Sequence, residues 1–143
     1  MATGTTTVYP NAKLKLLDGT IDLDSDTLKV ILMNNSHTYN AAHTQLSDIT
    51  ANQISTGSGY TQNDKTLASV TLTNLSGTIR FDAPDVSWTA SGGDITAYAA
   101  VIYDDTVSGD LLIANVQFSA VESAGDTTDF NLIWNTSGIF TLT

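Results

Sequence analysis

Short apolar runs with a strand-like alternation, separated by turn-forming residues roughly every eight to twelve positions, limit what this chain can fold into. The alternation is clear at residues 70–73, at residues 78–81 and in the C-terminal run DFNLIW. About nine or ten such runs are present, and helical spacing is rare between them. The pattern predicts an all-β fold: a single-domain antiparallel β-sandwich or a jelly-roll-like barrel, with at most one short helix.

The amino-acid composition supports this fold class. Of the 15 acidic residues 14 are aspartate, and the chain also holds 23 threonines and 13 serines. Aspartate and serine compete with the helical backbone for hydrogen bonds and favour turns, while threonine favours strands. The length of 143 residues suits one domain, which buries enough surface to fold without disulfides. Because the chain has no cysteine, thiol catalysis and thiolate metal sites are excluded.

The net charge of −10 excludes some classes of partner. Nucleic-acid binding depends on lysine and arginine, and only five such residues are scattered along the chain. Anionic membrane surfaces are disfavoured for the same reason, and no apolar stretch approaches the roughly 20 residues of a membrane span. Residues 1–12 lack the basic and apolar regions of a secretion signal. We therefore expect a protein made in the cytoplasm that binds neither nucleic acid nor membrane.

The chain is expected to divide into an arm and a domain. Residues 1–11 are rich in threonine and show no apolar periodicity, so they predict an extended N-terminal arm. Residues 12–143 then form a single β domain. Within this domain, residues 27–33 are apolar on both faces in their second half and predict a central strand. A helical turn is expected at residues 45–49, with Thr44 as its N-cap.

A β-hairpin is predicted over residues 13–24. Asp18-Gly19 lies between two alternating runs, and this dipeptide favours the two-residue type I′ turn. The resulting register gathers the leucine and isoleucine side chains on one face. On the other face it pairs lysines with aspartates, Lys13 with Asp24 and Lys15 with Asp22.

The same aspartates resemble the start of a calcium loop. Asp22, Asp24 and Asp26 have the D-x-D-x-D spacing, but the sixth position is not glycine and the twelfth is not glutamate. Two of the three already have lysine partners in the hairpin register, so cross-strand charge pairs are a better interpretation than a metal site. The two histidines, His37 and His43, are six residues apart, which does not assemble the three or four ligands that zinc needs. We expect no metal and no cofactor.

Catalytic patterns are also missing. There is no G-x-S-x-G nucleophile motif and no phosphate-binding glycine loop. The aspartates that could serve as paired carboxylates lie mostly in turns, where their side chains bond the local backbone. The sequence therefore predicts that the protein is not an enzyme.

Partner contacts are expected in the arm and in two long polar loops. Residues 34–50 and 56–64 are long connections, and such loops commonly carry binding residues. Tyrosines within them are typical of protein interfaces, and they could also stack on sugars. The candidate interface residues are Tyr9, Pro10, His37, Tyr39, His43 and Tyr60. If the arm is separate, deleting residues 2–9 should leave the domain folded and weaken attachment.

Several blocks of the chain together resemble a known family. The blocks are residues 19–33 (GTIDLDSDTLKVILM), 57–69 (GSGYTQNDKTLAS), 81–104 (FDAPDVSWTASGGDITAYAAVIYD), 111–118 (LLIANVQF) and 131–142 (NLIWNTSGIFTL). In this order they resemble the small virion structural proteins of tailed bacteriophages and prophages. The family has no catalytic residues to carry over to this chain.

The resemblance implies a role outside the capsid. Such proteins look like capsid decoration or cement subunits, so we expect an all-β subunit that binds the major capsid protein and stabilises contacts between capsid subunits. It also implies a homotrimer at three-fold positions and a location on the virion exterior. A tail or neck component is an alternative within the virion. A carbohydrate-binding module for host attachment is an alternative from another class.

Overall fold

The computed structural model describes all 143 residues and is mostly β, with 43% of residues in strands and 10% in helices. This confirms the predicted all-β, sandwich-like single domain. The strands are β1 (Gly4–Val8), β2 (Leu28–Met33), β3 (Thr71–Leu75), β4 (Thr78–Asp82), β5 (Val86–Thr89), β6 (Ile95–Asp104), β7 (Leu111–Ala124), β8 (Asp129–Leu132) and β9 (Phe140–Leu142). The helical elements are α1 (Pro10–Leu17) and two 3₁₀ turns, η1 (Leu46–Asp48) and η2 (Thr50–Asn52).

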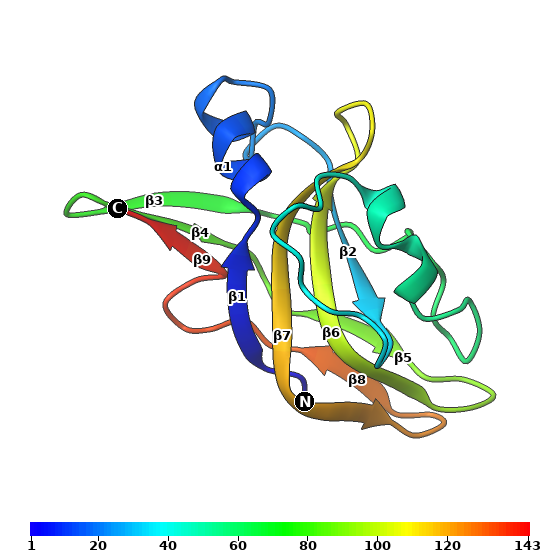
Figure 1. The fold of residues 1–143 in the computed structure, drawn as a ribbon. Coiled ribbons are helices and arrows are strands. Elements are labelled where there is room, and N and C mark those ends of the chain that lie inside the picture. The colour runs from blue at the N-terminus through cyan, green and yellow to red at the C-terminus, as the bar shows by residue number, and fades with distance from the viewer.

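The strands form three antiparallel sheets around one core (Figure 1). The largest has the order β1-β7-β6-β2, a second has the order β3-β4-β9, and β5 pairs with β8. A single cluster of 36 buried apolar residues draws on all three sheets. The central strand β6 is apolar and buried over most of its length, because both of its faces are covered.

The two edge strands of the largest sheet differ in whether other segments cover them. The apolar strand β2 was predicted to be central, but it is the last strand of this sheet. Its outer edge is covered by two loop segments, through hydrogen bonds from Ile54 N–H to the Leu32 carbonyl and from Val30 N–H to the Lys65 carbonyl. Five of the six residues of β2 are buried, so this strand is enclosed although it is the last one of its sheet. The opposite edge, β1, has no such cover along most of its length.

The N-terminal segment is part of the domain, which corrects the expectation of a separate arm at residues 1–11. It is extended as predicted, but β1 pairs with β7 in a continuous register from Gly4–Phe118 to Val8–Ala114. Ala2 is 1% exposed and Tyr9 is fully buried, so both belong to the core. Threonine suits a half-covered edge strand, which explains a segment without apolar alternation.

Helix α1 replaces the first half of the hairpin predicted over residues 13–24. Pro10 occupies the first helical position, where its fixed φ angle is favourable and its missing N–H is not needed. Gly19 follows the helix with φ +77°, and the next two backbone N–H groups donate to the Lys15 carbonyl. Asp-Gly therefore ends a helix here, a role it fills as readily as a hairpin turn. The predicted cross-strand lysine pairs are absent, and Lys15 instead contacts Asp18 at 3.0 Å.

Candidate functional site

The six side chains predicted to form an interface do not share one surface. Tyr9, Tyr60 and His37 are 0%, 2% and 9% exposed, so in this structure they are not available to a partner. Tyr39 and His43 are half-buried, and only Pro10 is exposed. The interface prediction is therefore corrected for the three buried residues.

Tyr60 attaches its loop to the main sheet. Its hydroxyl oxygen accepts hydrogen bonds from Leu32 N–H at 3.1 Å and from Gln53 Nε2 at 2.9 Å. Its ring lies 6.0 Å from the ring of Trp88, measured between centroids. Burial raises the pKa of Tyr60, so the hydroxyl stays neutral and keeps its place in this network. The residue stabilises the fold and does not form a binding surface.

His37 and Tyr9 hold the other long loop in the same way. His37 Nε2 lies 2.8 Å from the Asn115 side-chain oxygen on β7, and burial lowers the pKa of the imidazole. The Tyr9 ring packs on Tyr39 with 5.1 Å between centroids. In the sequence, a single aromatic or histidine residue among turn-forming residues is the only feature that could have predicted that these side chains point toward the core.

The aspartates after α1 serve the local backbone. Asp26 Oδ2 accepts a hydrogen bond from Asp22 N–H at 2.7 Å, and Asp22 Oδ1 accepts one from Asp24 N–H at 3.3 Å. No group of three or more histidine, aspartate or glutamate side chains is arranged to hold a metal ion. The arrangement is that of aspartates in turns.

An uncovered apolar patch lies at one end of the second sheet. In the pairing of β3, β4 and β9, the residues Leu72, Ile79 and Leu142 share a face with the buried Phe81 and Phe140. The core-facing side of this sheet therefore continues beyond the core. The patch is formed by the exposed Leu72, Ile79 and Leu142, which line a groove of about 310 Å³ together with the half-buried Leu16 and the buried Ile21 and Leu23.

The exposure of this patch follows from the β3–β4 hairpin, which projects away from the body of the domain (Figure 1), and from the edge position of β3, since Leu72 pairs with Phe81 and is exposed nonetheless. Phe81 is 1% exposed near the base, whereas Leu72, Ile79 and Leu142 are 45%, 37% and 36% exposed. Contiguous apolar surface of this kind is typical of sites that bind other proteins. The alternation in the sequence predicts that these residues share one face of the sheet. It does not predict that this face extends beyond the core and is left exposed.

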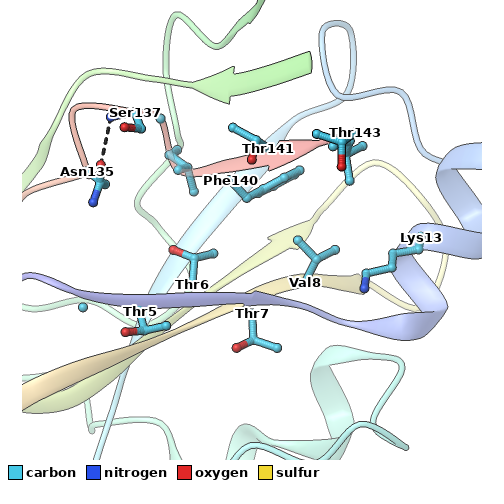
Figure 2. A pocket seen from close by; sticks show the side chains of 14 residues that line it. Thr5, Thr6, Thr7, Val8, Lys13, Asn135, Ser137, Phe140, Thr141 and Thr143 are labelled. Carbon is cyan, nitrogen blue, oxygen red and sulfur yellow. Dashed lines mark hydrogen bonds between the residues drawn. The ribbon is translucent and has the colours of Figure 1, made fainter. Parts of the chain in front are cut away.

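A second hollow lies on the open side of the sandwich, between β1 and β9; we call it the β1–β9 cleft. It has a volume of about 840 Å³ and is lined by all of β1, by residues 137–143, and by Lys13 and Asn135. Figure 2 shows Thr6 and Val8 pointing toward β9 and Phe140 pointing back toward β1. No backbone hydrogen bond joins the two strands.

The cleft differs in charge from the rest of the molecule. None of its lining side chains is acidic, although the net charge of the chain is −10. Its one lysine or arginine side chain, Lys13, is exposed and forms no ion pair. This site could not be predicted from the sequence, because residues 1–11 show no apolar periodicity that would place them beside β9.

None of the helices combines the length and the apolar character that crossing a membrane requires. Comparison with known protein families, with curated proteins and with solved structures finds no match to this chain.

Proposed function

We propose that this protein is a structural subunit of a tailed-phage virion, a head decoration protein that binds the outside of the capsid. The observation that supports it most is the apolar patch at the end of the second sheet. Removing apolar surface from water stabilises an interface, and a lone subunit that leaves such a patch uncovered is suited to permanent assembly. The family resemblance at the sequence level supplies the virion setting.

The available surface suits several contacts at once. The subunit exposes 6880 Å², and a standard interface takes about 800 Å² from each partner. Two contacts within a trimer and one with the major capsid protein would together use roughly a third of that area. The acidic exterior favours solubility of the subunit before it assembles.

Paired leucine substitutions on one hairpin test the patch. Leu72 and Leu75 are 45% and 48% exposed, but they point to opposite faces of β3. Leu72→Ser should weaken attachment to capsids about tenfold, because about half of a leucine side chain, worth ~1–1.5 kcal/mol, would no longer be buried at the contact. Leu75→Ser is the matched control and should attach normally.

Co-sedimentation of the purified protein with capsids that lack it measures attachment, and thermal unfolding checks that both variants fold. Equal attachment of the two variants would contradict a role for the patch. Electron microscopy of labelled virions then places the protein, and a position on the tail or neck would contradict the head assignment. A glycan array tests the carbohydrate-binding alternative, for which burial of Tyr9 and Tyr60 has removed two stacking platforms.

A further inference from the structure

We infer that the β1–β9 cleft binds an extended segment of a different polypeptide, which adds to the free edge of β1 and brings an acidic side chain to Lys13. This inference rests on the proposed function, which makes another virion protein the source of the segment. The contact itself is one added β-strand.

The register of β1 defines which backbone groups are free. Ser119 N–H donates to the Thr3 carbonyl and Tyr9 N–H donates to the Ile113 carbonyl, so the odd-numbered residues of this strand bond to β7. Hydrogen-bonded and non-bonded positions alternate in an antiparallel pair. The N–H and C=O groups of Gly4, Thr6 and Val8 therefore point away from β7, and no partner in the chain takes them.

The chain already uses this edge one step earlier. Ala2 N–H donates to the Asn131 carbonyl at 2.7 Å, and Ile133 N–H donates to the Ala2 carbonyl at 2.8 Å. Beyond Ile133 the chain no longer pairs with this edge. The outward N–H and C=O groups of Gly4, Thr6 and Val8 therefore continue the edge without a partner. A free strand edge of this kind is a template for another strand.

The lining residues show that the cleft follows the strand edge. Successive side chains on a strand point to opposite faces, yet all five residues of β1 line the cleft. An added strand would therefore send alternate side chains inward, over Val8 and Phe140, and outward to solvent. Small or β-branched residues suit the inward positions, because Thr6 and Val8 point into the same space (Figure 2).

Local charge selects an acidic segment. Three of the five basic side chains are already engaged: Lys15 with Asp18, Lys29 with Asp105, and Lys65 over the Trp88 ring. Of the two without such a partner, Lys13 lines the cleft, whereas Arg80 lies on the face of β4 opposite to Phe81 and does not line it. In a chain of net charge −10, the Lys13 end of the cleft is the surface that attracts an acidic side chain.

A second copy of this chain is a poorer occupant. Its extended segments are paired within their own sheets, β1 with β7 and β9 with β4. Its long loops are held inward by Tyr60 and His37. The free edge of β1 in a second copy carries no acidic side chain that could meet Lys13, so the segment comes from a different protein.

A display library of random linear peptides of about ten residues, long enough to run past β1, provides the probe. Selection on the wild-type protein should enrich peptides with alternating β-branched residues and at least one aspartate or glutamate. Thr6→Pro removes an outward N–H, which an edge strand tolerates, and should weaken binding of the enriched peptides tenfold or more. Thr6→Val keeps that N–H and is the matched control, while Lys13→Glu should also weaken binding.

Hydrogen exchange keeps the test decisive if Thr6→Pro fails to fold. In the wild-type protein, bound peptide should slow exchange of the Gly4, Thr6 and Val8 amides. The inference is overturned if no peptide is enriched, if the enriched peptides are basic, if Thr6→Pro binds them as tightly, or if those amides stay unprotected. A wild-type oligomer that Thr6→Pro converts to monomer would overturn it in favour of a second copy. The selection uses no virion, so its failure leaves the capsid attachment experiment to decide the proposed function.

Discussion

Replacing Asp104 with asparagine should make this protein more stable at neutral pH. Asp104 ends β6 and is 0% exposed. Its Oδ1 accepts hydrogen bonds from Thr106 N–H at 2.8 Å and from Val107 N–H at 3.2 Å, whereas its Oδ2 has no partner. Burial raises the pKa of Asp104 to about 6, and the neighbouring Asp26 carboxylate adds to the rise.

The size and sign of the effect follow from this pKa. Because the folded state holds the proton more tightly than the unfolded chain, the contribution of Asp104 to stability is greatest below pH 4 and falls as the pH rises through 6. A change in pKa from 3.8 to about 6 corresponds to roughly 3 kcal/mol. Asparagine keeps the oxygen that accepts both N–H groups, carries no charge, and places an NH₂ donor where Oδ2 has no partner. We expect Asp104→Asn to recover up to about 3 kcal/mol at pH 7.5 and almost nothing at pH 3.5.

Urea unfolding followed by the fluorescence of the buried Trp88 and Trp134 measures both proteins from pH 3.5 to pH 8. The difference between the two curves isolates Asp104, because the other titrating groups are common to both proteins. Thermal unfolding should show a gain of as much as roughly 10 °C at pH 7.5.

Asp105→Asn is the matched control. The Asp105 carboxylate is next to Asp104 in the sequence, but it is partly exposed and lies 2.9 Å from the Lys29 ammonium group. This variant should lose no more than about 1 kcal/mol and should not gain stability at high pH. An Asp104→Asn protein that is less stable than wild type at pH 7.5, or whose advantage does not change with pH, would refute the argument from burial.

Three further variants test the fold. Tyr60→Phe removes the acceptor of two buried donors and should cost about 2 kcal/mol in urea unfolding; a loss under about 0.5 kcal/mol would show that the donors find another acceptor. Deleting residues 2–9 removes an edge strand and the buried Tyr9, so circular dichroism should show loss of the cooperative thermal transition, and a sharp transition would restore the idea of a separate arm. Gly138→Ala places a Cβ 2.5 Å from Arg80 Cγ at φ +103° and should cost about 1–3 kcal/mol, whereas Gly77→Ala, at φ +95° with open space around it, should cost less.

The fold class and most of the strands could be predicted from the order of the residues alone. The alternation at residues 70–73 and 78–81 marks the β3–β4 hairpin, and the apolar run from residue 95 marks the central strand β6. These features are local, because a strand is recorded in the spacing of neighbouring side chains. The turn-forming residues between them are local signals as well.

Whether an ambiguous segment lies inside or outside the core depends on contacts between distant parts of the chain, and these could not be predicted. Residues 13–24 satisfied a hairpin register, yet Pro10 and Gly19 bound a helix whose Ala12 is buried. Tyr60 lies in a polar loop and was predicted to contact a partner. Its hydroxyl instead accepts hydrogen bonds from Leu32 N–H on β2 and from the Gln53 side chain, and neither contact is encoded in the residues next to Tyr60. Burial, the pairing of an edge strand and the reach of a sheet beyond its core are relations between segments far apart in the chain. For that reason the β1–β9 cleft and the apolar patch became visible only when the sheets were assembled.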